Sequence, residues 1–454
     1  MKIASVFSID TFTRNVSGAM WIFARLPDDG TAAASIHRSI QREIWREFKL
    51  GDRVAMCLAL PFAPFVLALL VLGFTVANGS AIKKRTGKRV IQQIREQVDC
   101  AVNLAILPPW YYMFELHDDD KRRHAGEYLN RFETKAAGLY VFLRDNNGGQ
   151  PVPAERSTPS IKDKARFRDR CREHGVATAP VLLNVSEKQI AVVDCNSPEL
   201  PERDLFIKPS SGQGGKRTSR WDYLGSGRFQ RSNGETLTRE QLLEHLQQAS
   251  RRGALVVQPR LVNHKELADL ANGTLATVRA MTCRNEQGGI EMTNAVFRMA
   301  KSKSRVVDNF HAGGIAANVD IHTGELGPGT RGAWGVTADG WYERHSETGA
   351  QILHRKLPCW SELIALVQRA HSSAFSDQVV IGWDVALLDS GPCIMEANRA
   401  PDLDIIQRAG GGPIGNQRLG KLLAFNLMRT IEARRVLPVA HEKAQNQLRP
   451  DNLS

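Results

Sequence analysis

Residues 382–398 read GWDVALLDSGPCIMEAN, a sequence that predicts a β-hairpin. Two apolar segments flank the polar turn Asp389-Ser-Gly-Pro392, whose residue types favour a tight chain reversal. Glu396 and Asn398 are two positions apart, so their side chains leave the same face of the second strand. If strand pairing places Asp384 opposite them, three oxygen donors converge in a group that suits Mg2+. The alternative is a hairpin whose acids are solvated on its outer face.

The length and composition are typical of a folded protein. The chain has 454 residues, of which 42% are hydrophobic and 24% are charged, so it can bury sizeable cores. Its seven cysteines include no Cys-x-x-Cys pair. This pattern argues against a disulfide framework or a zinc site, and it favours a reducing compartment. The net charge of +12 favours anionic lipid or phosphate partners over nucleic acid, because no nucleic-acid motif accompanies it.

A long uncharged segment predicts attachment to a membrane. Residues 54–77 carry no charge, and as a helix these 24 residues would be about 36 Å long, enough for a ~30 Å hydrocarbon core. The segment begins too deep in the chain for a cleaved signal peptide. The basic residues that follow it are denser than those before it, so we expect the remainder of the chain to face the cytoplasm. The flanking residues are Arg42, Arg46, Lys49 and Arg53 before it, and Lys83, Lys84, Arg85, Lys88 and Arg89 after it.

The topology of this segment stays open at this level. Pro61 and Pro64 each lack a backbone donor, so they could kink one transmembrane helix or break it into a re-entrant hairpin. A buried helix of a soluble protein is the alternative to membrane attachment. The aromatic cluster at 110–114 likewise fits either a lipid headgroup boundary or a protein core.

Changes in residue pattern divide the chain into five parts. Within the first, residues 35–49 form a basic amphipathic pattern suited to an anionic lipid surface. Short apolar strands alternate with amphipathic helices in the fourth, which is the pattern of an α/β or α+β domain. The expected parts are an amphipathic N-terminal arm (1–53), the uncharged segment (54–77), a helical connector region (78–150), the α/β or α+β domain (151–436) and a polar tail (437–454).

A glycine-rich loop follows a lysine at the end of an apolar strand. Residues 205–208 read LFIK, and residues 209–216 read PSSGQGGK. The backbone amides of such a loop can approach phosphate oxygens, although its spacing is not that of a P-loop. Lys164, which opens a predicted helix, could supply a second ammonium; a mobile turn and a solvated lysine are the alternatives. The candidate phosphate-binding residues are Lys164, Lys208, Ser210, Ser211, Gly212, Gly214 and Gly215.

The strand predicted at 255–261 (LVVQPRL) runs into a proline and can offer main-chain groups to an adenine edge. Gln258 and Leu261 are its candidate contacts. Glu266, shortly beyond, is a candidate for ribose hydroxyls, with a solvated helix acid as the alternative.

Two arginines lie in apolar strand-like segments, where an unpaired guanidinium would be costly. We expect Arg279 and Arg298 to bind phosphate or a carboxylate, since the planar fork of arginine matches both; a structural ion pair is the alternative. The loop that follows reads VDNFHAGG over 307–314, and an acceptor pocket there could include Asn309, Gly313 and Gly314. His311 could be a base, but a lone loop histidine is more often solvated.

In this order, the lysines, glycine-rich loop, linker strand, arginine strands and Asp…Glu-x-Asn resemble the ATP-grasp superfamily. The pattern from Arg279 to Asn398 resembles the glutamate-adding ligases. More narrowly, Asp163-Lys164, the 307–314 loop and Gly382-Trp-Asp384 resemble the sugar-transfer-associated ATP-grasp proteins. The resemblance covers about residues 160–407. It departs from the pattern at Gln258-Pro259, where many such enzymes carry a glutamate.

The resemblance implies an α+β fold in which two α+β subdomains clasp ATP, preceded here by the helical, membrane-associated N-terminal region. Lys164 and Lys208 would hold phosphate oxygens, and Arg298, with Arg279, would stabilise charge on the transferred group. The metal ligands for Mg2+ would be Asp384, Glu396 and Asn398.

The activity implied is that of an ATP-grasp ligase, which joins a carboxylate to an amine through an acyl phosphate and releases ADP. Its partners would be membrane lipid and a small-molecule carboxylate with an amine or a sugar-linked substrate, in cell-envelope or exopolysaccharide assembly. Two alternatives stand beside it: phosphoryl transfer to a sugar or other hydroxyl acceptor, and a non-catalytic membrane scaffold with an ATP-grasp shell.

Overall fold

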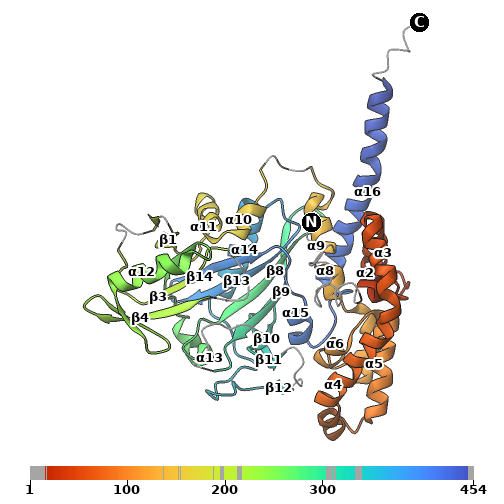
Figure 1. Ribbon diagram of the computed structural model, residues 1–454, viewed down its shortest axis with the longest axis horizontal. Coiled ribbons are helices and arrows are strands. Elements are labelled where there is room, and N and C mark those ends of the chain that lie inside the picture. The colour runs from red at the N-terminus through yellow and green to blue at the C-terminus, as the bar shows by residue number, and fades with distance from the viewer. Residues whose placement is uncertain are drawn as a thin grey trace.

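Figure 1 shows the computed structural model, in which N-terminal helices stand beside a body built from two β-sheets. The chain is thus α+β, as predicted. Side chains are described as far as residue 436. The structure describes residues 16, 18–135, 138–151, 153, 155–187, 189–194, 199–211, 217–302, 310, 313–332 and 340–447.

The first sheet contains the predicted hairpin. Its strand order is β12-β11-β10-β9-β8-β13-β14, and every neighbouring pair is antiparallel. The hairpin forms because the polar turn at Asp389 separates two apolar segments whose side chains alternate between the faces of the sheet. The strands are β8 Thr277–Arg284, β9 Ile290–Met299, β10 Ile315–Val319, β11 Leu326–Arg331, β12 Trp341–Tyr342, β13 Val380–Leu388 and β14 Gly391–Asn398.

Both faces of the first sheet are covered. One face, which includes Trp383, packs on α14 Trp360–Ala374 and α11 Lys164–Glu173 in a continuous core. The opposite face, which includes Met281 and Cys283, packs on α9, α15 and α16. These three helices are Leu139–Asp145, Asp404–Ala409 and Arg418–Gln447. Arg279 and Asp384 belong to this second face, because they lie an even number of positions from Met281 and Val380 along their strands.

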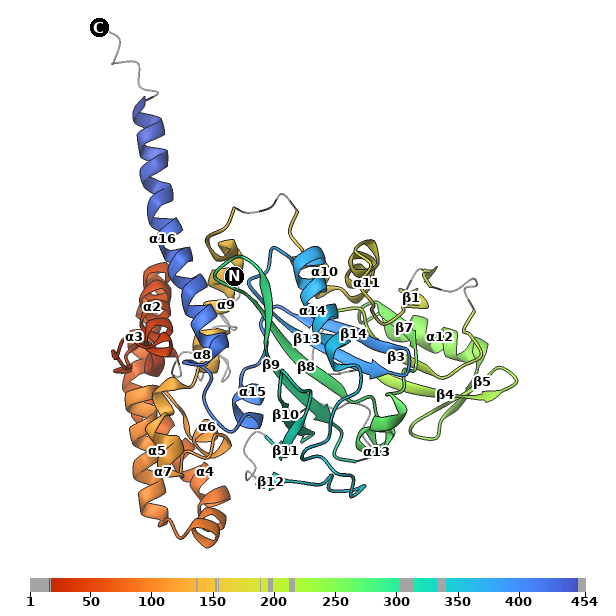
Figure 2. The same ribbon diagram turned by 180° about the vertical axis from the view of Figure 1, so that it is seen from behind.

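The second sheet has a smaller core of its own, with α12 Arg239–Ser250 packed on it (Figure 2). Its strand order is β2-β1-β7-β3-β4-β5-β6. The apolar strand predicted at 205–208 is present as β3, the strand predicted at 255–261 ends earlier, as β7, and the helix predicted to open at Lys164 is α11. The strands are β1 Leu183–Val185, β2 Ile190–Val192, β3 Leu205–Pro209, β4 Ser219–Gly225, β5 Arg228–Arg231, β6 Thr236–Thr238 and β7 Leu255–Pro259.

The N-terminal helices form one edge of the molecule in both views (Figures 1 and 2). Polar contacts join them to α15, which packs on the first sheet: Gln407 exchanges two hydrogen bonds with the backbone of Leu129, at 2.9 and 3.2 Å. These helices are α2 Ala32–Glu47, α3 Leu50–Ala59, η2 Leu60–Phe62, α4 Ala63–Thr86, α5 Val90–Leu104, α6 Pro108–Met113, α7 Asp119–Arg123, η3 Ala125–Glu127, α8 Arg131–Thr134, α9 and η4 Asn147–Gly149.

The uncharged segment is a nearly continuous helix. Pro61 and Pro64 lie in the first turns of η2 and α4, where a missing backbone donor is tolerated, so the chain does not reverse there. Among the described helices, the run Leu50–Thr86 is the one long and apolar enough to cross a membrane, with a mean hydropathy of 2.5 in its most apolar window. Length and composition alone are weak evidence for a membrane span.

Two expectations for the N-terminal region are resolved by packing. The apolar face of α2, which includes Ile36, Ile40 and Ile44, is buried against protein, α16 among it, so the idea that this helix lies on lipid is wrong. The aromatic cluster at 110–114 is core packing, because Tyr111 and Tyr112 are buried within the helical region. Lipid and protein cover apolar surface equally well, so the pattern in the sequence did not distinguish them.

Candidate functional site

The hairpin brings the two predicted acids together. Asp384 is the cross-strand partner of Glu396, and Gly382 is the partner of Asn398. Paired residues in an antiparallel sheet point to the same face, so all three predicted oxygen donors share one face. The register shifts directly after Asp384, at a bulge in β14.

Two arginines hold Asp384. Arg279 Nε donates a hydrogen bond to Asp384 Oδ1 at 2.6 Å, and Arg298 Nη2 lies 3.0 Å from Asp384 Oδ2. Burial raises the pKa of this carboxyl, but the two guanidinium groups outweigh burial and lower the pKa to about 2. Both arginines therefore form the structural ion pair that was the alternative to ligand binding. Arg298 is also fixed by Thr277, whose hydroxyl accepts a hydrogen bond from Arg298 Nε at 3.1 Å.

The pKa of Glu396 shifts in the opposite direction to the pKa of Asp384. Its pKa is raised, first by burial and then by the negative charge of Asp384, while Lys208 and Lys164 oppose the rise. Two carboxylates that repel each other in a buried place are a suitable host for a divalent cation, which would neutralise both.

The third predicted ligand would bind a cation through its amide oxygen, but its unpartnered atom is the nitrogen, a donor that suits a phosphate oxygen. The side-chain amide of Asn398 contains a buried nitrogen with no hydrogen-bond partner among the described residues. No group of three or more histidine, cysteine, aspartate or glutamate side chains in the described part of the chain could hold a metal ion. The predicted set is of another kind, because it contains two carboxylates and one amide.

A short segment brings the two sheets together beside this hairpin. Ala179 N donates to Ile394 O at 3.1 Å in the first sheet, and Leu182 N donates to Val257 O at 2.8 Å in the second. As a result, Lys208 of β3 lies close enough to Glu396 and Asp384 for their charges to affect its pKa. The lysine is 8% exposed, and burial lowers its pKa to about 8, with Lys164 contributing in the same direction.

The start of α11 carries the second lysine to the same place. Lys164 N donates to Ser210 O at 2.9 Å, and the hydroxyl of Ser210 donates to Asp163 Oδ2 at 2.7 Å. Asp163 also caps α11, because its side chain accepts from the amides of Ala165 and Arg166. These contacts join the first residues of the glycine-rich segment to the helix that carries Lys164.

Several candidates are not placed by the structure. Ser210 and Ser211 lie just before residues 212–216, which are outside the described residues, and Gly313 and Gly314 directly precede β10, whose Ala316 is the strand partner of Arg298. The remaining loop candidates lie outside the described residues; they are Gly212, Gly214, Gly215, Asn309 and His311.

The linker strand has one feature that fits a ligand. Gln258 is buried on β7, where its Nε2 donates to Pro180 O at 3.0 Å, while its Oε1 has no partner among the described residues. Leu261 is half-buried just after the strand. Glu266 is exposed on η5 Lys265–Leu267, as the alternative of a solvated helix acid expected.

Two features near the site had no clear signal in the sequence. A Cβ atom added at Gly382 would lie 2.6 Å from Cβ of Pro401, so only glycine lets this proline cross the strand beside Arg279. Tyr140 of α9 is 3% exposed, its hydroxyl has no partner among the described residues, and burial raises its pKa, with Asp402 and Arg279 also acting on it. Helix α9 comes from the N-terminal region, so no local pattern could place it here.

Comparison with known proteins agrees with this arrangement. A family model described as sugar-transfer associated ATP-grasp matches residues 150–420. No curated protein sequence matched the chain.

Solved structures with a similar fold are distant. A D-alanine–D-alanine ligase from Bacillus anthracis is 15% identical, with 62% of this chain and 70% of that chain covered and a TM-score of 0.33. An L-amino acid ligase from Bacillus licheniformis is 12% identical, with 68% and 59% covered and a TM-score of 0.37. Similarity at this level does not bear on the reaction.

Proposed function

The chain belongs to the sugar-transfer associated ATP-grasp family, whose model spans more than half of its length, and from this premise we propose that it is a membrane-associated, Mg2+-ATP-dependent ligase. It joins a small-molecule carboxylate to an amine or a sugar-linked substrate, through an acyl phosphate. Transfer of the γ-phosphoryl group to the carboxylate releases ADP, and attack of the amine on the acyl phosphate then releases inorganic phosphate.

The observation that carries this proposal is the meeting of opposite charges between the two sheets. Asp384 and Glu396 of the first sheet lie within electrostatic reach of Lys208 of the second, with Lys164 nearby. A buried set of this kind suits a metal–polyphosphate ligand, because the cation would neutralise the acids and the phosphates would neutralise the lysines. Binding would thus offset the cost of burying the acids and the cost of burying the lysines together.

The chain's own residues would divide the work of binding. Lys164 and Lys208 would hold phosphate oxygens, and the segment from Ser210 would cover them. On the linker, Gln258 has an unpartnered buried acceptor that suits an exocyclic amino group, with Leu261 beside it and Glu266 toward the ribose. Asp384, Glu396 and Asn398 would hold Mg2+, whose bound ATP supplies the transferable phosphoryl group.

Arg279 and Arg298 would act on the reacting groups. Both guanidinium groups are held in place by Asp384, so little reorganisation is needed when negative charge develops beside them. Arg298 is anchored a second time by Thr277, which fixes its orientation. The acceptor side would include Asn309, Gly313 and Gly314.

The cellular setting is a further part of the proposal. The basic excess of the chain and the exposed apolar helix Leu50–Thr86 support membrane lipid as a partner, with the catalytic domain in the cytoplasm. The family description supports an association with sugar transfer, and a role near cell-envelope or exopolysaccharide assembly is part of the proposal. Nucleic acid is not expected to bind.

The test is ADP release by the purified full-length protein with ATP, Mg2+ and pooled envelope metabolites, followed by mass identification of the product. Hydroxylamine in place of the amine should yield a hydroxamate if an acyl phosphate forms. The variant Glu396→Gln should abolish turnover, whereas Glu173→Gln, an exposed acid on α11, should not change it.

Other outcomes would favour the other functions. A phosphorylated sugar without any hydroxamate would indicate phosphoryl transfer to a hydroxyl acceptor. Absence of any turnover, together with ATP binding that survives in Asp384→Ala/Glu396→Ala, would indicate a scaffold.

A further inference from the structure

One face of the long apolar helix is exposed along its length. Its outward residues recur every three or four positions, so they form a single stripe on one side of the helix. Phe65 is 66% exposed and Val76 is 83% exposed, which is unusual for large apolar side chains of a soluble protein. This stripe, called the apolar stripe below, consists of Leu58, Phe62, Phe65, Leu69, Leu72 and Val76.

The opposite face of the same helix is buried in protein over the same length. Ala63, Leu67 and Val71 follow one another at four-residue spacing and are all buried. Leu67 and Val71 pack on Ala101 of α5, and Ala63 packs on Val16. In the described structure, every turn of α4 except the last has one side covered by protein, so lipid could not surround the helix on all sides.

The contacts on the buried face become polar toward the C-terminal half of α4. Gln97 Nε2 donates to the hydroxyl of Thr75 at 2.9 Å, and Gln93 Nε2 donates to Gly79 O at 3.1 Å. The partner helix α5 has 15 residues, about 22 Å, and is too short to cross a ~30 Å hydrocarbon core beside α4.

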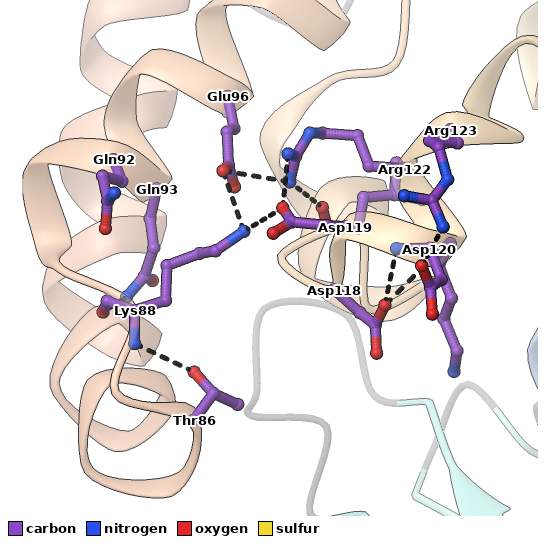
Figure 3. A network of polar contacts seen from close by, with 12 residues as sticks. Thr86, Lys88, Gln92, Gln93, Glu96, Asp118, Asp119, Asp120, Arg122 and Arg123 are labelled. Atoms are coloured by element: carbon purple, nitrogen blue, oxygen red, sulfur yellow. Dashed lines mark hydrogen bonds and ion pairs between the residues drawn. The ribbon is translucent and has the colours of Figure 1, made fainter.

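Charged groups surround the end of this helix pair. Figure 3 shows Lys88 Nζ between Glu96 and Asp119, at 2.8 and 2.7 Å, with Arg122 2.9 Å from Glu96. If α4 crossed a bilayer, Glu96 on α5 and the groups paired with it would be carried toward the hydrocarbon at a high cost in free energy. The same network is favourable in water or at a headgroup surface.

From these observations we propose that the helix Leu50–Thr86 lies in the plane of an anionic bilayer, with the apolar stripe immersed in a single leaflet, and that it does not cross the membrane. The inference rests on the membrane attachment proposed above and specifies its form. Residues 49–89 contain seven basic residues and one acid, and the basic residues lie at both ends of the stripe. Lys49, Lys83, Lys84 and Arg89 are exposed, so headgroups can meet positive charge at each end of a helix that lies flat.

Fluorophore depth measured in vesicles of phosphatidylcholine and phosphatidylglycerol tests the orientation. Single cysteines replace Leu58, Phe65 and Val76, in full-length protein whose Cys57, Cys195 and Cys359 are changed to serine. Leu58 and Val76 are 18 residues apart, about 27 Å along a helix. A flat helix places the three labels at one shallow depth. A helix that crosses places the Phe65 label near the bilayer centre and the other two near opposite surfaces, which would overturn the inference.

A matched pair of variants tests the surface itself. Leu69→Glu should weaken binding to these vesicles about tenfold or more, because a charge enters the immersed stripe. Leu224→Glu, on β4 of the second sheet, should bind like the parent; these two leucines are 56% and 48% exposed. Vesicles of phosphatidylcholine alone should bind the parent more weakly than anionic vesicles.

The remaining outcomes separate the two proposals. Failure of the parent to bind any vesicle would refute both the orientation and the membrane attachment, and it would leave the ligase activity to its own assay. A stable dimer that dissociates in Leu69→Glu, without vesicle binding, would identify a second copy of this chain as the occupant of the stripe and would overturn the inference.

Discussion

Arg279 Nε and Asp384 Oδ1 lie 2.6 Å apart on neighbouring strands, and this contact fixes the centre of the candidate site. The carboxylate is buried and also meets Arg298, so the three charges depend on one another.

The substitution Asp384→Asn should lower the free energy of unfolding by about 3–5 kcal/mol, because it removes the buried negative charge that Arg279 and Arg298 both contact. Urea denaturation measures the change. Asp222→Asn is the matched control: Asp222 also contacts two arginines, at 2.8 and 3.4 Å, but its side chain is 34% exposed, so we expect a loss of about 1 kcal/mol or less. Equal losses in the two variants would contradict this account.

The contribution of Asp384 should disappear in acid. Its pKa is lowered to about 2 from an ordinary value of 3.8, so its stabilisation is complete above about pH 4 and is lost as the pH falls through 2. The shift corresponds to a free energy on the order of 2 kcal/mol. The difference in unfolding free energy between the parent and Asp384→Asn should therefore shrink between pH 5 and pH 2. A constant difference over this range would show that the lowered pKa is not the cause.

The substitution Lys208→Met should stabilise the ligand-free protein while it weakens ATP binding. Burial lowers the pKa of this lysine to about 8. Below pH 8 the fold therefore buries a charged ammonium, which costs stability relative to the unfolded chain. The unfolded chain retains its proton up to about pH 10, so the parent should gain stability between pH 8 and pH 10, and Lys208→Met should not. Thermal unfolding across this range and ATP titration measure the two effects. Lys162→Met, an exposed neighbour of Lys164, should change neither.

The substitution Glu396→Gln should preserve or raise the stability of the ligand-free protein but remove Mg2+-dependent nucleotide binding. Its pKa is raised by burial and by Asp384, so a neutral isostere relieves repulsion. Mn2+ titration monitored by electron paramagnetic resonance, with and without ATP, reports the metal directly. Unchanged Mn2+ affinity in this variant would exclude Glu396 as a ligand.

The helical layer should be required for the fold of the ATP-grasp domain. Glu115 lies 3.1 Å from Arg408 of α15, and Arg408 is almost fully buried. Burial raises the pKa of Glu115, but Arg408 and Lys121 outweigh it and lower the pKa to about 2. Glu115→Gln should cost about 3–5 kcal/mol of unfolding free energy. Asp120→Asn removes an exposed pair with Arg123 and should cost less than about 1 kcal/mol; a similar loss in both would argue that the layer is dispensable.

The sequence by itself determined those elements whose signals lie within one short segment of the chain. The hairpin at 382–398 was predictable because its turn and its alternation of apolar residues lie within one short segment. The strands that carry Lys208 and Gln258, and the helix that begins at Lys164, were predictable for the same reason. The order of these motifs along the chain was enough to indicate the family.

Only the tertiary structure decided which of these residues face one another. Lys208 comes within electrostatic reach of Glu396 because residues 177–182 hydrogen-bond to both sheets, and such non-local pairing leaves no periodic signal. The same limit applies to α2, whose apolar face is covered by protein, and to α4, whose apolar stripe is left exposed. Sequence specifies how much apolar surface a segment presents, because that depends on its own side chains. The partner that covers it depends on how distant segments pack, and that is set only in the folded chain.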